Sequence, residues 1–379
     1  MIDKIKSKFR EVFNSANPAI IVRAPGRVNF IGEHTDYQEG FVLPGAIERY
    51  VYLAASFSAK KEITLYADTF GEYFATSFAD ITKQKGSSWY SYVLGVAHFL
   101  QIPAEGMNIL IMSNLPAGKG LSSSAALETG AALLFKRLFA INLDDLETIK
   151  ICRRAENEFV GVPCGIMDQF ISLKGKKNHL LFLDTRSLDF SYYPFPRNAS
   201  LLVVDTGVKR KLNEVGYEQR KQECETSVKI LKKLYPNLKT LRDLSPGPEE
   251  WEDFLPPTLR KRVRHVVSEN KRVKETCKAL ETGDLSRVGE LLVESHQSLR
   301  DDYQVSCREA DNLVEISLRA EGVYGARMTG AGFGGSIVIL CEKGKEETVL
   351  SHILANYRTP EGELPFYLKT SLEEGACEL

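Results

Sequence analysis

Three features that would mark a membrane, secreted or zinc-dependent protein are missing from this chain of 379 residues. No run of about 18 apolar residues is present, so the sequence predicts no membrane-spanning helix. Residues 1–18 are amphipathic and interrupted by charge, and they lack the apolar core of a signal peptide. We interpret this segment as a short surface helix, with a transit peptide as the alternative.

The cysteines form no CxxC pair and no cluster with histidines. They are Cys152, Cys164, Cys224, Cys277, Cys307, Cys341 and Cys377. An odd, scattered set of this kind predicts reduced thiols in a cytoplasmic protein and no structural zinc site. Lys and Arg total 49 against 50 Asp and Glu, with no basic stripe. The sequence therefore predicts no nucleic-acid partner and favours a small ligand.

Strand-like and helical segments mix along the chain without a regular pattern. The strand-like segments are 19–24, 51–56, 107–113, 180–184, 201–205 and 336–341. The segments with helical spacing are 89–100, 122–139, 144–160, 213–235, 259–320 and 346–357. Because βαβ alternation is absent, the pattern predicts an α+β fold rather than a doubly wound sheet. The change to charged helices near residue 200 predicts two domains, 1–200 and 201–379.

The first polar motif is APGRVNFIGEHTDY at residues 24–37, directly after a predicted strand. It gathers Arg27, Asn29, Glu33, His34 and Asp36 beside two glycines. Carboxylates form strong, charge-assisted hydrogen bonds with hydroxyl groups, so the motif indicates a site for a hydroxyl-rich ligand. A solvated turn with an ion pair is the alternative. His34 is flanked by acidic residues and stands alone, without a second histidine nearby, so we expect no metal there.

The second motif is LPAGKGLSSSAALE at residues 115–128. A strand leads into a glycine-bearing loop, three serines and then good helix formers. Backbone N–H groups at a helix start, together with the helix dipole, form a cradle for phosphate. The spacing is not that of a Walker A loop. The serines are predicted to ligate Mg²⁺ or, as the plainer alternative, to cap the helix.

The third motif, RMTGAGFGGS at residues 327–336, matches G-x-G-x-x-G at Gly330, Gly332 and Gly335. A strand-like segment follows it rather than a helix, so we reject a dinucleotide site. Glycines before a strand instead allow the backbone to approach another loop or a bound phosphate closely.

A fourth segment, AENEFVGVPCGIMDQ at residues 155–169, ends a helix at Gly161 and turns at Pro163 and Gly165. Asp168 then lies among apolar residues, where a carboxylate is either a helix cap or a positioned base. Cys164 precedes a glycine with no histidine nearby, so we favour a packing role over a nucleophilic one.

Together these motifs resemble those of the galactokinase family, within the GHMP small-molecule kinase superfamily. GRVNFIGEHTDY is similar to the family signature, LPAGKGLSSSAA to its ATP-binding motif and MTGAGFGG to its third motif. AENEFVGVPCGIMDQF resembles the catalytic segment, and VDTGVKRKLNEVGYEQRKQE resembles a sugar-binding segment. The resemblance covers about residues 18–342 in family order, which makes it far more specific than any one motif.

The resemblance implies roles for individual residues. Asp168 would be the base that accepts the C1-hydroxyl proton of galactose, and Arg27 the cation that keeps it ionised and offsets phosphoryl charge. The implied galactose contacts are Glu33, His34, Thr35, Asp36, Gly165, Asp168 and Tyr217. The implied ATP contacts are Gly118, Lys119, Gly120, Leu121, Ser122, Ser123, Ser124, Trp89 and Tyr92. Ser124 and Glu156 would bind Mg²⁺ through hard oxygen atoms. Trp89 as a core residue is the alternative.

The implied fold is a two-domain GHMP kinase. Its N-terminal domain resembles ribosomal-protein S5 domain 2, its C-terminal domain is ferredoxin-like, and the active site lies between them. The implied protein is a cytoplasmic monomer that uses MgATP and galactose and forms galactose 1-phosphate. Lys119 and Gly45 depart from the usual family residues. A kinase for galacturonate, N-acetylgalactosamine or arabinose stays open, whereas the intact serines at 122–124 disfavour a silent galactose sensor.

Overall fold

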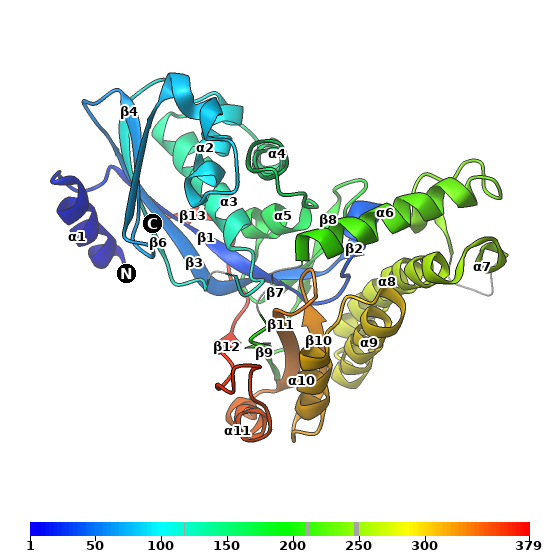
Figure 1. The fold of residues 1–379 in the computed structure, drawn as a ribbon. Coiled ribbons are helices and arrows are strands. Elements are labelled where there is room, and N and C mark those ends of the chain that lie inside the picture. The colour runs from blue at the N-terminus through cyan, green and yellow to red at the C-terminus, as the bar shows by residue number, and fades with distance from the viewer. Residues whose placement is uncertain (117, 209–212, 246–249) are drawn as a thin grey trace.

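The computed structural model describes residues 1–116, 118–208, 213–245 and 250–379. The sequence SPGP at residues 245–248 predicts a loop, and most of it lies outside these ranges. Residues 209–212, in the segment that resembles a sugar-binding one, also lie outside them. The main helices are α1 (Ile2–Phe13), α2 (Trp89–Leu100), α3 (Ser123–Leu138), α4 (Asp145–Arg154), α5 (Met167–Lys174), α6 (Asn213–Leu231), α7 (Trp251–Phe254), α8 (Pro257–Thr282), α9 (Leu285–Ser298), α10 (Arg308–Leu318) and α11 (Glu346–Asn356) (Figure 1).

In the part of the chain that the structure describes, the strands form three sheets. They are β1 (Ile20–Asn29), β2 (Phe41–Val42), β3 (Pro44–Phe57), β4 (Glu62–Ala67), β5 (Glu72–Ser77), β6 (Met107–Ser113), β7 (His179–Asp184), β8 (Phe190–Pro194), β9 (Ala199–Asp205), β10 (Val323–Thr329), β11 (Ser336–Glu342), β12 (Tyr367–Thr370) and β13 (Cys377–Glu378). Their orders are β13-β1-β3-β6-β4-β5, β10-β11-β9-β12 and β2-β7-β8. Within the described residues, sheet and helix mix as an α+β fold, which confirms the predicted class.

The six-stranded sheet has a helical layer on each face. The amphipathic helix α1 packs Ile5 and Phe9 against Tyr52 and Leu110 on one face. Helices α2 and α3 cover the other face, where Leu53 and Phe135 belong to the largest core cluster. The N-terminal segment is therefore the surface helix that the sequence predicts.

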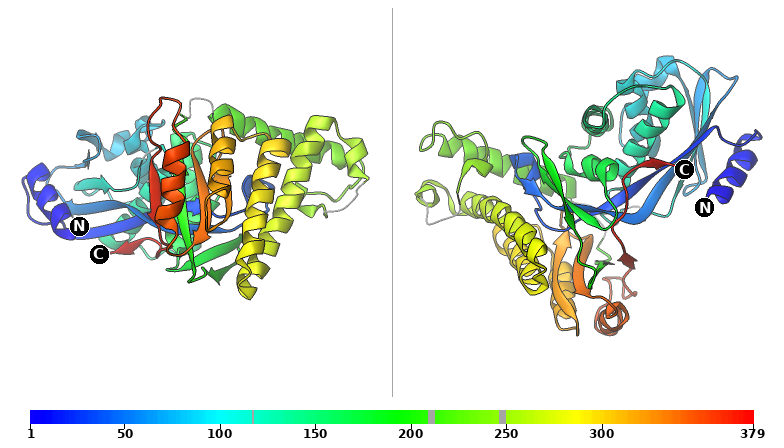
Figure 2. Two further views of the ribbon diagram at one scale, coloured as in Figure 1. Left: turned by 90° about the horizontal axis from the view of Figure 1, so that it is seen from below. Right: turned by 180° about the vertical axis from the view of Figure 1, so that it is seen from behind.

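The four-stranded sheet separates two cores by simple strand alternation. Leu201 and Val203 of β9 face the largest core, whereas Leu202 and Val204 face the core that includes Leu313 of α10. This period of two is what strand geometry requires of a sheet that is buried on both faces. Figure 2 shows the long helices α8 and α9 side by side, with α9 against strand β10.

Most predicted elements are present, with changed limits. The helix predicted at 144–160 is α4 followed by a π-helical turn, Ala155–Val160. The helical region predicted at 259–320 is divided into α8, α9 and α10, with a second π-helical turn at Leu299–Tyr303. Strands β2, β4, β5, β8, β10, β12 and β13 were not predicted.

The chain returns to its first sheet at the end. Strand β13 pairs with β1, opposite Val22 and Arg23, so both termini lie at the N-terminal sheet (Figures 1 and 2). Strand β9 begins at Ala199, near the predicted domain boundary. The boundary itself stays a prediction, and residues 377–378 belong by pairing to the N-terminal sheet.

Gly289 of α9 packs directly on strand β10. A Cβ atom there would lie 2.0 Å from the carbonyl oxygen of Tyr324. We therefore expect Gly289→Ala to destabilise the protein by about 1–3 kcal/mol, although alanine is the better helix former by about 1 kcal/mol. Thermal unfolding measures this, with the exposed Gln297→Ala on the same helix as control. A Gly289→Ala variant as stable as the wild type would contradict the packing.

Candidate active site

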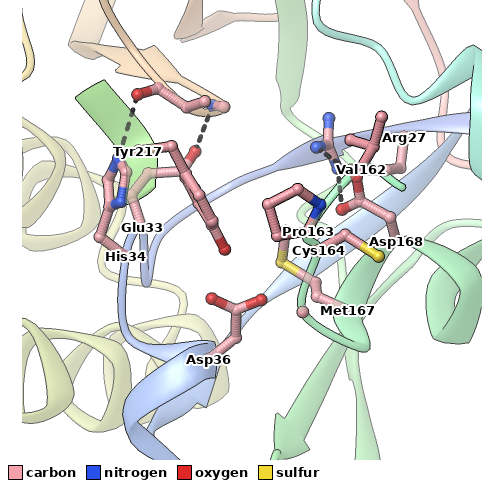
Figure 3. A pocket seen from close by; sticks show the side chains of 13 residues that line it. Arg27, Glu33, His34, Asp36, Val162, Pro163, Cys164, Met167, Asp168 and Tyr217 are labelled. Atoms are coloured by element: carbon pink, nitrogen blue, oxygen red, sulfur yellow. Dashed lines mark hydrogen bonds and ion pairs between the residues drawn. The ribbon is translucent and has the colours of Figure 1, made fainter. Parts of the chain in front are cut away.

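A cavity of about 340 Å³ lies where the loop after β1 meets helices α5 and α6 and the third-motif loop. This size is within the usual range for small-molecule sites. Its lining residues are Arg27, Glu33, His34, Asp36, Val162, Pro163, Cys164, Gly165, Met167, Asp168, Tyr217, Gly330 and Ala331 (Figure 3). Three of the four sequence motifs therefore line one cavity.

Arg27 and Asp168 form a two-pronged ion pair at the edge of this cavity. Arg27 Nε donates to Asp168 Oδ1 and Nη2 to Oδ2, each at 2.8 Å. The Ser122 hydroxyl also donates to Asp168 Oδ2. Asp168 lies in the first turn of α5. Residues far apart in the sequence thus hold one carboxylate in a fixed orientation.

Glu33 joins the first motif to the third. Its Oε1 accepts hydrogen bonds from the backbone N–H of Gly330 at 2.7 Å and from Thr329 Oγ1 at 3.1 Å. Asn29 Nδ2 donates to Oε2 at 2.7 Å. The fully buried guanidinium of Arg327 lies 3.5 Å from Oε1. The close backbone approach predicted for the glycine motif is confirmed, since the Gly330 backbone contacts another loop.

His34 belongs to a buried polar chain at one end of the cavity. Its Nε2 lies 3.2 Å from the carbonyl oxygen of Ala331, and its Nδ1 lies 2.9 Å from Tyr37 Oη. Tyr37 Oη is 2.5 Å from Tyr303 Oη. Burial and the nearby His265 lower the pKa of His34 to about 3, so the ring is neutral at physiological pH.

Asp36 and Tyr217 point into the cavity opposite the Arg27–Asp168 pair (Figure 3). Burial and the neighbouring Asp168 raise the pKa of Asp36 to about 6, and burial raises the pKa of Tyr217 well above its usual value. A Cβ atom on Gly165 would lie 1.5 Å from Asp36 Oδ2. Glycine is therefore needed at 165 for Asp36 to occupy its position.

Thr35 lies outside the cavity lining. Its hydroxyl contacts the carbonyl oxygens of Gly32 and Phe41 at 3.0 and 2.8 Å, and it is fully buried. This threonine therefore holds the shape of the motif loop. Cys164 does line the cavity, but burial raises the pKa of its thiol well above its usual value, which agrees with a packing role.

Residues 118–124, which we call the glycine–serine loop, lead into the N-terminus of α3. Gly118 and Gly120 have φ values of 74° and 77°, in the region that favours glycine. Ser122 precedes the helix, but no serine side chain caps it, so the capping alternative is wrong. None of the backbone N–H groups of 118–122 donates to another described residue. These groups remain available to an anionic ligand at a helix N-terminus.

A second, mainly apolar cavity of about 170 Å³ adjoins the start of α3. Its lining includes Trp89, Tyr92, Ser123 and Ser124, all of which the resemblance assigned to the ATP site. Trp89 is half-buried, packs against the largest core cluster and donates from Nε1 to Glu72 Oε2 at 2.8 Å, so it lies at the edge of the core beside this cavity. Phe70 also lines this cavity, and nothing in its local sequence had indicated that.

The predicted metal ligands lie together. Glu156, in the π-helical turn, lies close to the side chains of Cys164 and Ser124. Gln169 Nε2 donates to Glu156 Oε2 at 2.6 Å and to the buried Glu128 Oε2 at 3.0 Å. Among the described residues no group of three or more His, Cys, Asp or Glu side chains forms a metal site. One carboxylate and one hydroxyl nevertheless suit Mg²⁺, which keeps waters and phosphate oxygens as its other ligands.

The sequence did not predict the buried residues that hold the first motif in place from behind the cavity. Glu269 of α8 accepts hydrogen bonds from the backbone N–H groups of Gly32 and Glu33 at 2.9 and 3.3 Å. Nearby Arg272 and other donors lower the pKa of Glu269 to about 2 despite its burial. It stands in a helix rich in charged residues, so no local signal distinguishes it.

Comparison with known proteins agrees with this site. A model of the galactokinase galactose-binding signature matches residues 7–57, and models of the GHMP kinase N- and C-terminal domains match 91–176 and 277–359. Similar relatives include the galactokinases of Chloroflexus aggregans, 42% identical over 94% of this chain and 92% of theirs, and of Thermotoga maritima, 42% identical over 89% and 93%.

Solved structures give the same result. The crystal structure of Lactococcus lactis galactokinase complexed with galactose has a TM-score of 0.94 at 32% identity, and the match covers 100% of this chain and 99% of that one. Methanococcus jannaschii mevalonate kinase, with a TM-score of 0.69 at 21% identity over 94% and 98%, shares the fold. Fold and motifs thus define the chain as a GHMP kinase, an ATP-dependent small-molecule kinase. Within that superfamily it belongs to the galactokinase family and is a sugar kinase.

The buried position of Glu33 generates a stability prediction. Glu33→Ala leaves the Arg327 guanidinium buried without its carboxylate, and loss of one partner of a buried pair costs about 3–5 kcal/mol. Thermal or urea unfolding measures the change. Glu33→Gln, which keeps an acceptor for Gly330 and Thr329, should lose less. Wild-type stability in Glu33→Ala would show that this carboxylate does not join the two motifs energetically.

Proposed function

We propose that the protein transfers the γ-phosphoryl group of ATP to the C1 hydroxyl of α-D-galactose, giving galactose 1-phosphate and ADP. The observation that carries this is the Arg27–Asp168 pair, which lies in a sugar-sized cavity beside the glycine–serine loop. Asp168 is the base and Arg27 its counter-cation. Arg27 also offsets charge on the transferring group, the main task of a protein in phosphoryl transfer.

The bonding of Asp168 supports its assignment as the base. A carboxylate has about four acceptor directions. Arg27 occupies one on each oxygen, and Ser122 occupies the second on Oδ2. One direction on Oδ1 is left, and we assign it to the C1 hydroxyl. The proton moves to this oxygen as the C1 oxygen attacks the γ-phosphorus and the bond from phosphorus to the ADP oxygen breaks.

Recognition of the sugar is assigned to the opposite wall. Asp36 and Tyr217 accept and donate hydrogen bonds at the C3 and C4 hydroxyls, and Gly165 leaves room for them. Glu33 and His34 line the same end of the cavity and hold its shape through the third motif, while Thr35 acts through the loop. The match to a galactokinase complexed with galactose supports this choice of sugar.

ATP is assigned to the glycine–serine loop and the second cavity. The N–H groups of 118–122, which donate to no other described residue, and the N-terminus of α3 would bind the phosphates. Trp89 and Tyr92 would flank the adenine. Ser124 and Glu156 are the residues that would hold Mg²⁺, which when bound offsets phosphate charge. The proposal also includes two domains, 1–200 and 201–379, a monomeric state and a cytoplasmic location. The seven free cysteines are in keeping with that compartment.

The direct test of the proposal is an ATP-consumption assay with purified protein over galactose, N-acetylgalactosamine, galacturonate, arabinose and glucose. Galactose should be the preferred substrate. A higher kcat/KM for another of these sugars would overturn the galactose assignment and leave the sugar kinase class intact.

Asp168→Asn tests the base. The amide cannot take up the proton, so kcat should fall by about 10²–10⁴-fold, while galactose binding persists because the cavity keeps its shape. Steady-state kinetics and calorimetry measure the two quantities. Asp145→Asn, which alters an exposed aspartate paired with Lys174 at 2.9 Å, is the matched control. Near-normal turnover of a folded Asp168→Asn variant would exclude the base role.

Asp36→Ala tests the choice between galactose and its C4 epimer glucose. A misplaced hydroxyl leaves buried polar groups unpaired, so we expect the wild type to favour galactose by about 10³-fold in kcat/KM. Asp36→Ala should lower galactose use severely and shrink that ratio, whereas the exposed Asp189→Ala should change neither. An unchanged ratio would remove Asp36 from the account of specificity.

A further inference from the structure

Lys119 stands in the glycine–serine loop but is bonded at two points to the C-terminal sheet. Its Nζ lies 2.5 Å from Asp205 Oδ2, at the end of strand β9. Its carbonyl oxygen accepts a hydrogen bond from Ser336 Oγ, the first residue of β11, at 2.9 Å. Ser336 and Asp205 are direct partners in the β9–β11 register, so the two bonds reach one point of the sheet.

The next two carbonyl groups of the loop are also bonded, on the other side. Gly120 O accepts from Arg27 Nη1 at 2.6 Å, and Leu121 O accepts from the Arg27 backbone N–H at 3.0 Å. Three successive carbonyl oxygens of the loop thus accept hydrogen bonds from other segments of the protein. The backbone N–H groups of 118–122 donate to no other described residue. Bonding the carbonyl side leaves the N–H side for the ligand.

The Lys119–Asp205 pair differs from a surface ion pair in its burial. The Asp205 side chain is 4% exposed and that of Lys119 is 35% exposed. Besides Lys119, the Asp205 carboxylate accepts from the backbone N–H of Gly207 at 3.2 Å. A carboxylate as buried as this needs a cationic partner, so the pair resists opening far more than an exposed one.

We propose that Lys119 and Asp205 form a latch that holds the glycine–serine loop against the C-terminal sheet in the shape that binds nucleotide. Lys119 is then a positioning residue, whose ammonium group acts through Asp205 rather than on the phosphates. Binding a preformed loop costs less conformational entropy than binding a loose one, so the latch raises nucleotide affinity. This inference rests on the proposed assignment of the loop to ATP.

The alternative is that the Lys119 ammonium contacts phosphate directly and Asp205 competes for it. The two models differ in what loss of Asp205 does. In the latch model Asp205→Asn loosens the loop and weakens nucleotide binding. In the direct-contact model Asp205→Asn releases the lysine and leaves binding unchanged or tighter.

The experiment measures the Kd of ADP and of ATP without sugar, for Lys119→Met, Asp205→Asn and the double variant. Each single change should raise Kd about 10-fold, and the double variant should also be about 10-fold weaker rather than 100-fold, since both changes break one contact. In steady state the KM for ATP should rise while the KM for galactose stays within twofold. Ser336→Ala, which removes only the carbonyl bond, should weaken binding by a smaller factor.

Lys345→Met is the matched control, because Lys345 is also 35% exposed and pairs with Glu321 at 2.6 Å away from the loop. It should leave nucleotide Kd unchanged. If Lys119→Met alone unfolds the protein, the double variant takes its place, because it leaves no unpaired carboxylate. A nucleotide Kd of the double variant equal to that of Asp205→Asn then supports the latch. Unchanged or tighter binding in Asp205→Asn overturns the latch. Absence of galactose phosphorylation in the wild type would instead refute the proposed function, since nucleotide binding is measured without sugar.

Discussion

The carboxylate of Glu33 is the contact on which the rest of the site depends. It is almost fully buried and takes hydrogen bonds from two loops that are about 300 positions apart in the sequence. A buried carboxylate requires donors on all sides, and only this arrangement of the first and third motifs supplies them. The cavity wall formed by His34, Asp36 and Ala331 follows from that junction.

The need of a buried carboxylate for hydrogen-bond donors also explains why the two walls of the cavity are held separately. One wall comes from the loop that Glu33 fixes, and the opposite wall carries the Arg27–Asp168 pair, oriented by β1 and α5. Because each wall is held by its own network, Asp36 and Asp168 face each other across the cavity as two carboxylates. Their mutual repulsion adds to burial in raising the pKa of Asp36 to about 6. A ligand rich in hydroxyl donors relieves both effects.

The sequence predicted the parts of the protein that depend on local pattern. Strands such as Met107–Ser113 and helices such as Trp89–Leu100 have clear periodicity, and their limits agree with the structure. The alternation in Glu62–Ala67 is also a strand pattern and could have been predicted, whereas the two-residue strand β13 forms only because β1 offers it an edge. Contacts between distant segments, such as Glu269 with Gly32 or Lys119 with Asp205, leave no local pattern. The pairing of Arg27 with Asp168 could be expected only from the resemblance to a known family.

The pairing of β13 with β1 has a consequence for how the chain folds during synthesis. The strand that ends the six-stranded sheet on the β1 side consists of residues 377–378, and the backbone N–H of Leu379 donates to Ile21 O. These residues leave the ribosome after every other described segment. Until then β1 is an open edge, and open edges invite pairing with other chains. The nascent N-terminal sheet therefore keeps its β1 side unprotected until residues 377–378 have been made, although its other five strands can already pair.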